Sequence, residues 1–210
     1  MPRRQLSRSR RGAAGSIRII GGDWRGRRLD VLTEPDLRPT PDRVRETLFN
    51  WLAPVIAGAR CLDLYAGTGA LGLEALSRGA AECWFVEKNA RLASALEATL
   101  VRFASAPGSV IDRPAPLGRV LVADAAGWLG RGPATTFDVV FLDPPYATDQ
   151  LGELCTLLAH GWLSPVAAVY LETSRSRQLP ALPAGWQLHR EAQAGDVRYA
   201  LAHVRSPSTP

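Results

Sequence analysis

The segment from Arg60 to Gly79 constrains the fold more than any other part of the chain. A short apolar run over residues 61–65 leads into the glycine turn at residues 66–69, and an Ala- and Leu-rich stretch follows up to Gly79. This order is typical of a buried strand, a tight turn and a helix that packs back on the sheet. Further short apolar runs alternate with helical patterns toward the C-terminus, which predicts an α/β fold with a doubly wound, mostly parallel sheet.

Hydrophobic periodicity places the other elements of this sheet. Seven strands are expected, over 61–65, 82–86, 120–123, 138–142, 167–171, 186–190 and 197–204, with the last two as an antiparallel pair. Helices are expected over 69–77, 90–103 and 149–159. Residues 104–119 are rich in Pro, Gly and Ala, so we expect a flexible loop there without a catalytic role.

The region before the sheet is predicted to form a small extension. Two short strands, around 18–20 and 27–31, would be joined at Gly21-Gly22, and a helix would run from Pro41 to about Val55 with Thr40 as its cap. The expected organisation is a disordered basic tail over 1–16, the extension over 17–56, a catalytic domain over 57–205 and a disordered tail over 206–210.

Charge is distributed unevenly along the chain. Residues 1–30 hold nine Arg against Asp23 and Asp30, whereas the remainder holds sixteen basic and eighteen acidic residues. Such an N-terminal excess indicates a segment that meets polyanions. The candidates for contact with a polyanion are Arg18, Arg25, Arg27 and Arg28, with the arginines of the first sixteen residues as the alternative. The first sixteen residues also resemble a transit peptide in composition, but they lack the apolar stretch of a secretory signal.

Cysteine and histidine usage argues against a metal centre. The three Cys lack ligand spacing and the three His are scattered, so we expect reduced thiols, no metal and a cytoplasmic protein. Apolar runs are short and interrupted by charges, so no membrane span is expected.

Acidic residues lie within one predicted strand and directly after three others. They are Asp63, Glu87, Asp124 and Asp143, and the carboxyl ends of strands in an open α/β sheet are where ligands bind. Residues 67–72 also match G-x-G-x-x-G, so a nicotinamide or flavin dinucleotide is an alternative ligand. Asp63 opposes that alternative, because its carboxylate would repel a pyrophosphate and would instead suit the ammonium group of a methionine moiety. Glu87 is placed to accept from ribose hydroxyls and Asp124 from an adenine amino group, so we predict S-adenosylmethionine as the cofactor.

The run Asp143-Pro144-Pro145-Tyr146 is the most specific chemical motif in the chain. The two prolines lack backbone donors and hold the segment extended, which leaves the Asp143 carboxylate and the Pro144 carbonyl as paired acceptors. Paired acceptors match the two hydrogens of an exocyclic amino group and stabilise the positive charge that develops as its nitrogen attacks a sulfonium methyl group. Tyr146 offers a face on which a base stacks.

With these motifs in place, the chain resembles the RsmD family, the bacterial 16S rRNA guanine-N2 methyltransferases. The resemblance extends from about Arg18 to His203 and is carried by residues 18–28, 38–51, 63–78 and 143–146. It implies a class I S-adenosylmethionine-dependent methyltransferase fold that acts, as a monomer, on guanine 966 of 16S rRNA or of the small ribosomal subunit. It also implies that Thr40 and Arg43 lie near the cofactor. The loop at 104–119 looks longer than is usual for the family, and the Arg-rich start is not part of its motif.

Two sets of site residues follow from the motifs and the resemblance. The predicted catalytic residues are Asp143, Pro144, Pro145 and Tyr146. The predicted cofactor-binding residues are Thr40, Arg43, Asp63, Tyr65, Ala66, Gly67, Thr68, Gly69, Glu87, Lys88, Asp124 and Ala125.

Three other functions remain as alternatives. Asp-Pro-Pro-Tyr also occurs in DNA adenine-N6 methyltransferases, but little chain is left here for the target-recognition domain that those enzymes carry. A dinucleotide-dependent oxidoreductase is opposed by Asp63 and by the proline motif. A non-catalytic RNA-binding domain would not require acids at four strand ends.

Overall fold

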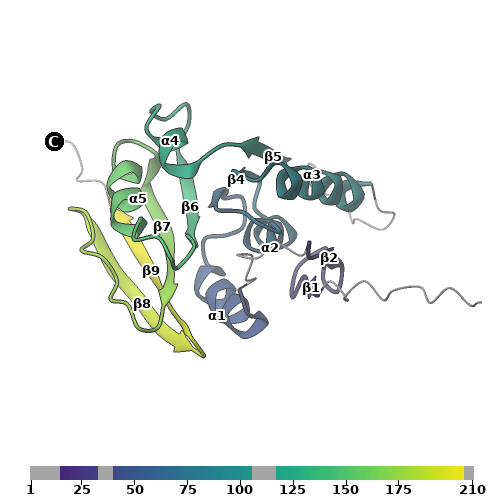
Figure 1. Ribbon diagram of the computed structural model, residues 1–210, viewed down its shortest axis with the longest axis horizontal. Helices are drawn as coiled ribbons and strands as arrows, with labels where there is room; N and C mark the ends of the chain where they lie inside the picture. The colour runs from purple at the N-terminus through teal and green to yellow at the C-terminus, as the bar shows by residue number, and fades with distance from the viewer. Residues whose placement is uncertain (1–14, 33–39, 106–116, 206–210) are drawn as a thin grey trace, which may run out of the picture.

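The computed structural model describes residues 15–32, 40–105 and 117–205 (Figure 1). Residues 1–14 of the tail expected over 1–16, the tail expected over 206–210 and most of the loop expected at 104–119 lie outside these residues. The strands are β1 (Ser16–Arg18), β2 (Arg28–Asp30), β3 (Arg60–Leu64), β4 (Glu82–Glu87), β5 (Leu117–Val122), β6 (Phe137–Leu142), β7 (Leu163–Ser174), β8 (Trp186–Ala194) and β9 (Val197–Arg205). The helices are α1 (Asp42–Leu52), α2 (Ala70–Ser77), α3 (Ala90–Ala104), α4 (Ala125–Leu129) and α5 (Leu151–Leu158).

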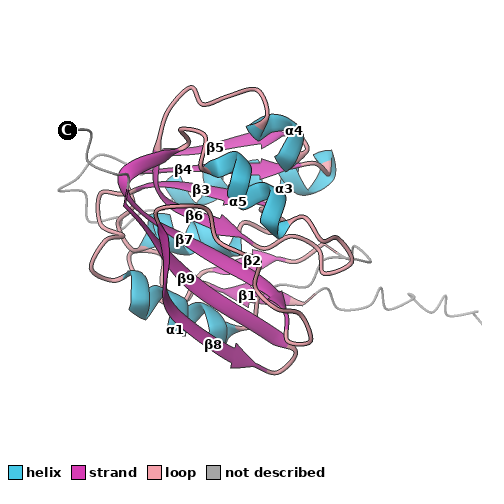
Figure 2. Ribbon diagram, turned by 90° about the vertical axis from the view of Figure 1, so that its left-hand side faces the viewer, coloured by secondary structure: helices cyan, strands magenta, loops and turns pink. Residues whose placement is uncertain are grey.

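The main sheet has seven strands in the order β5-β4-β3-β6-β7-β9-β8 (Figure 2). Neighbours from β5 to β7 pair in parallel, and β9 pairs antiparallel with both β7 and β8. The predicted doubly wound, mostly parallel sheet is therefore confirmed. The chain enters this sheet at β3 and adds β4 and then β5 on one side of it. The chain then crosses over, and β6 pairs with the other side of β3.

Two apolar layers cover the faces of this sheet. On one face, α1, α2 and α3 and the β1–β2 hairpin pack against sheet residues such as Cys61, Phe85 and Phe141. On the other face, α4 and α5 pack against residues such as Leu62, Val140 and Val169. Neighbouring residues of one strand face opposite layers, as the two-residue period of a strand requires. Both faces are buried, which explains why these strands read as continuous apolar runs.

Several element boundaries differ from the sequence expectations. β5 begins at Leu117, inside the predicted loop, and β7 extends on both sides of the predicted 167–171 because it pairs with β9 along nine residues. The helix α4 was not predicted. It has five residues, which is too short for a periodic signal, and it begins where the Asp124 side chain accepts from the Gly127 N–H at 3.0 Å.

The N-terminal hairpin turns over a broader segment than predicted, and Gly21-Gly22 lies within this segment. Ser16 pairs with Asp30, which also moves Ser16 from the predicted tail into β1, and residues 19–27 form a broad loop that packs on α2. Gly22 has φ +76°, and a Cβ built on it would lie 1.8 Å from the carbonyl oxygen of Ser77. This glycine therefore allows the loop to approach a neighbouring helix closely.

Thr40 does not cap α1, contrary to the prediction. The helix begins at Asp42, and the Val44 and Arg45 N–H groups both donate to the Pro41 carbonyl oxygen at 3.0 and 3.1 Å. The helix ends at Leu52, before the predicted Val55, and buries Val44, Leu48 and Leu52. The Thr40 hydroxyl instead donates a hydrogen bond to Asp143, in the segment that follows β6.

Replacing Gly22 with alanine should separate the extension from α2. We expect a lower free energy of unfolding by about 1–3 kcal/mol, because the new methyl group overlaps the Ser77 carbonyl. Gly26→Ala is the matched control, since Gly26 has φ +83° but nothing within 4 Å of its Cβ position. Urea unfolding of both variants measures the difference, and equal losses would show that backbone strain alone explains the effect of Gly22→Ala.

Candidate active site

The site lies where the order of the sheet strands reverses. β3 and β6 are neighbours at this switch point, and the chain leaves them toward opposite edges of the sheet. Asp63 is the fourth residue of β3, and Asp143 directly follows β6. A crevice at such a point is the usual ligand site of an open α/β sheet.

The turn after β3 is held in an unusual backbone conformation. Tyr65 has φ +68°, a region that costs a non-glycine residue about 1–2 kcal/mol. The Tyr65 and Ala66 N–H groups both donate to the Val86 carbonyl oxygen of β4 at 3.1 Å, and the Gly69 N–H closes the turn on the Ala66 carbonyl oxygen at 2.6 Å. A strained backbone turn that is stabilised by several hydrogen bonds is typical of a ligand site.

Asp63 is a buried carboxyl group at the base of this turn. Its side chain is 3% exposed, and its Oδ2 accepts from the Gly72 N–H of α2 at 2.9 Å. The pKa of Asp63 is raised to about 8, mainly by burial and to a smaller extent by the nearby charge of Glu87, while the hydrogen bond from Gly72 opposes the shift. Burial therefore favours the neutral form of Asp63, and a cation placed beside it would favour the charged form.

Asp63→Asn should change how stability depends on pH. The folded-state pKa of about 8 lies above the ordinary value of 3.8, so between these values the unfolded chain releases a proton that the folded chain retains. The free energy of unfolding of the wild type should then fall, relative to the Asn variant, by up to about 1.4 kcal/mol per pH unit over this window and stay level above it. Urea titrations at several pH values measure this gap, and a gap that does not change with pH would contradict the prediction.

Glu87 ties the glycine turn to the end of β4. Its Oε2 accepts from the Gly67 N–H at 2.9 Å and its Oε1 from the Asn89 N–H at 2.7 Å. Gly67 is itself buried, and Lys88 is exposed beside the turn. The structure thus brings the predicted residues 63–69 and Glu87 into one constellation.

Asp124 lies after β5, at the carboxyl ends of the parallel strands, as Asp63 and Glu87 do. It is exposed and caps α4 through the Gly127 N–H, whereas Ala125 is buried. The Tyr65 hydroxyl donates to Gln150 Oε1 at the start of α5 at 3.0 Å. The pKa of Tyr65 is raised to about 12, first by burial and then by the negative charges of Asp124 and Glu153.

Asp143 opens the proline motif after β6 and contacts the N-terminal extension. The Thr40 hydroxyl donates to Asp143 Oδ2 at 3.3 Å, so Thr40 lies at the proline motif. Burial and the neighbouring charge of Glu172 hold the pKa of Asp143 well above its ordinary range, against the opposing effect of the Thr40 bond. Within the motif, Pro144 is buried, Pro145 exposed and Tyr146 half-buried.

Glu172 and Tyr170 belong to the same cluster and were not predicted. The Tyr146 hydroxyl donates to Glu172 Oε1 at 2.9 Å, and the Tyr170 hydroxyl donates to Oε2 at 2.6 Å. Glu172 is 2% exposed, and burial raises its pKa. Glu172 directly follows the predicted strand 167–171, so the strand-end rule that found the other acids would also have found this one.

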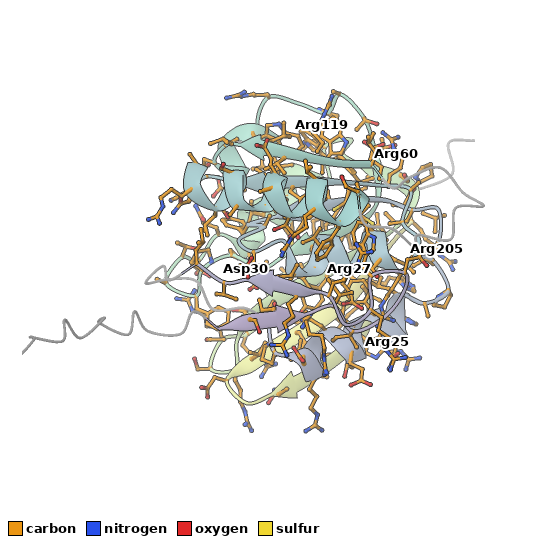
Figure 3. All side chains as sticks on the ribbon, turned by 90° about the vertical axis from the view of Figure 1, so that its right-hand side faces the viewer. Arg25, Arg27, Asp30, Arg60, Arg119 and Arg205 are labelled. Carbon is orange, nitrogen blue, oxygen red and sulfur yellow. The ribbon has the colours of Figure 1, made fainter. Side chains whose placement is uncertain are left out.

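The predicted RNA-binding arginines lie on the β1–β2 hairpin and its loop, and Arg25 and Arg27 are labelled in Figure 3. Arg18, Arg25 and Arg28 are exposed, whereas Arg27 is half-buried and donates to the Phe103 carbonyl oxygen at 2.8 Å with its guanidinium over the Phe103 ring. Arg27 therefore also attaches the hairpin to α3. Arg43, predicted to lie near the cofactor, is exposed on the first turn of α1.

The described parts of the chain contain neither a candidate metal site nor a candidate membrane-spanning helix. Over 15–32, 40–105 and 117–205, His, Cys, Asp and Glu side chains form no group of three or more that could hold a metal ion. Within the same ranges, every helix is too short or too polar to cross a membrane.

Comparisons with known proteins agree with this geometry. A family model described as "Conserved hypothetical protein 95" matches residues 17–203. The chain is 46% identical over 189 residues to the ribosomal RNA small subunit methyltransferase D of Escherichia coli K12, covering 90% of each chain. A solved structure of an E. coli protein described as a proposed methyltransferase, yhhF, is 45% identical with a TM-score of 0.77, covering 91% of this chain and 99% of that one.

A more distant solved structure shares the fold. It is a proposed methyltransferase, SMU.776, in complex with SAH, and it is 15% identical with a TM-score of 0.63 over 84% of this chain and 53% of that one. At this identity the likeness concerns the fold alone.

Proposed function

Because this chain belongs to the ribosomal RNA small subunit methyltransferase D family, we propose that it transfers a methyl group from S-adenosylmethionine to the exocyclic N2 of a guanine in 16S rRNA, guanine 966 by family resemblance. One observation carries this proposal. Asp143 and the Pro144 carbonyl follow β6 at the switch point, beside the β3 turn that holds Asp63. Methyl donor and amino acceptor would meet there.

The residues after β3 fit S-adenosylmethionine by their chemistry. Asp63 is a buried carboxyl group with a raised pKa, and an ammonium group beside it would favour its charged form. Glu87 and Asp124 would face the ribose and the adenine from the ends of β4 and β5. When bound, the cofactor supplies an electrophilic methyl group on a sulfonium.

Asp143, Pro144 and Tyr146 would act on the base. The Asp143 carboxylate and the Pro144 carbonyl accept from the two N–H groups of the target amine, while Tyr146 stacks on the ring. Bound S-adenosylmethionine would supply the methyl group and leave as a neutral thioether, and the methylated nitrogen would then pass one N–H proton to solvent. Asp143 stabilises the positive charge that develops on nitrogen.

A methyl-transfer assay tests this function. Tritiated S-adenosylmethionine is incubated with small ribosomal subunits, free 16S rRNA and DNA, and the labelled product is digested to nucleosides. We expect label in N2-methylguanosine from rRNA or subunits. Label in N6-methyladenine from DNA would support the alternative enzyme class, and no transfer from S-adenosylmethionine to any substrate would contradict the proposal.

The exposed hairpin arginines should provide phosphate contacts to the rRNA. Replacing Arg18, Arg25 and Arg28 together with alanine should weaken RNA binding and make the plot of log affinity against log salt shallower by about 2 units, since three single-strand phosphate contacts are lost. The methylated nucleotide should not change, because phosphate contacts position and do not specify. Arg131→Ala, an exposed arginine that follows α4 on the opposite face of the sheet, is the control. An unchanged slope in the triple variant would rule these arginines out as phosphate contacts.

A further inference from the structure

Glu172 lies outside the proline motif but contacts it. We propose that Glu172 is a positioning residue, which fixes the ring of Tyr146 in the orientation that the target base needs for stacking. This inference rests on the proposed function, because it assigns Tyr146 to the base.

The contacts of Glu172 link a buried part of the sheet to an irregular segment. Tyr146 lies in a turn after β6 and is not held by the hydrogen bonds of a helix or strand. Its hydroxyl reaches Glu172 at 2.9 Å, and the other oxygen of Glu172 is held by the Tyr170 hydroxyl at 2.6 Å. The Tyr170 ring is buried, with Phe141 and Tyr199 as aromatic neighbours at 6.5 and 6.4 Å. Tyr170 thus fixes Glu172, and Glu172 fixes Tyr146.

The residue type also favours this role. A carboxylate has two acceptor oxygens and can bind both tyrosine hydroxyls at once, whereas a glutamine amide has a single acceptor oxygen. Glu172 is almost fully buried near Asp143, and burial opposes its charge. An apolar residue at the end of β7 would avoid the cost of burying a charge, so the carboxyl group of Glu172 is unfavourable for folding. Its hydrogen bonds with Tyr146 and Tyr170 explain why a carboxyl group is present.

A double-mutant cycle on full-length enzyme tests the link. Tyr146→Phe keeps the ring but removes the hydroxyl, and Glu172→Gln keeps the shape but loses one acceptor. We expect each variant to lower kcat roughly tenfold, which corresponds to the loss of one hydrogen bond to a charged group. The double variant should also lose roughly tenfold, because both changes break the same bond. Cofactor affinity, measured by calorimetry, should stay within about twofold of the wild type.

A matched control separates positioning from packing. Tyr199→Phe removes a hydroxyl from a tyrosine of the same aromatic cluster, on the strand paired with β7, and should leave kcat unchanged whatever it does to the melting temperature. Losses that multiply to about a hundredfold in the double variant, or a wild-type kcat for Tyr146→Phe, would overturn the proposal. So would a Glu172→Gln variant whose defect is confined to KM.

The cycle is followed on whichever nucleoside the wild-type enzyme methylates. A failure of the proposed function would therefore appear in the identity of the wild-type product. A failure of the positioning role would appear only in the coupling between Glu172 and Tyr146.

Discussion

Replacing Asp143 with alanine should abolish most methyl transfer while leaving cofactor affinity nearly unchanged. The side chain would accept from the target amine and stabilise its developing charge, and the loss of one such preorganised group typically lowers kcat by about 10²–10³. Single-turnover methylation of the wild-type substrate measures the rate, and calorimetry with S-adenosylmethionine measures binding. Asp149→Ala is the control, because Asp149 lies six residues further on, in the loop before α5, and its side chain is 96% exposed.

The charge state of Asp143 should also appear in the pH profile. Burial and Glu172 raise the pKa of Asp143 above its ordinary value of 3.8, so its carboxylate forms only at higher pH. The rate should then rise with pH through an apparent pKa well above 3.8 that belongs to the Asp143–Glu172 pair. Asp143→Asn should retain some rate, since its amide oxygen still accepts, and should lose this dependence. A wild-type rate for Asp143→Ala would show that another group accepts the hydrogen bond from the target amine.

Replacing Glu74 with alanine should destabilise the protein more than Gly22→Ala does. Glu74 is fully buried in α2 and forms ion pairs with the buried Arg45 at 3.6 Å and with Arg78 at 2.7 Å. Its two oxygens also accept from the Ile20 and Gly21 N–H groups at 2.7 and 2.8 Å. Removing the carboxylate leaves the Arg45 charge buried without this partner, which typically costs about 3–5 kcal/mol.

Urea unfolding measures this loss, with Glu97→Ala on the exposed side of α3 as a control for removing a charge. Because the same carboxylate holds the extension on α2, Glu74→Ala should also weaken RNA binding more than it weakens cofactor binding. Replacing both Glu74 and Arg45 with leucine should cost less than replacing Glu74 alone, since no buried charge remains. A loss within about 0.5 kcal/mol for Glu74→Ala, the usual range for a surface change, would contradict this role.

Local sequence patterns were sufficient for the sheet and for much of the site. Apolar runs and helical periods predicted every strand of the main sheet, because both patterns depend only on the local order of residues along the chain. The carboxyl ends of parallel strands meet at one edge, so Asp63, Glu87 and Asp143 could be placed together before any contact was known. The short helix α4 and the ends of β5 and β7 were missed, since pairing with neighbouring strands and capping decide those boundaries.

Tertiary packing alone decided how the extension meets the core. Thr40 and Asp143 are 103 residues apart in the chain, and Gly21 and Glu74 are 53 apart, so no local period relates them. The Gly21-Gly22 pair predicted a turn because glycine permits one, but glycine also permits close approach, and only the position of Ser77 shows that Gly22 allows it here. The sequence by itself thus determined which chemical groups follow each strand. The folded chain decided which of them touch, because contacts between distant segments depend on how helices pack and not on residue spacing.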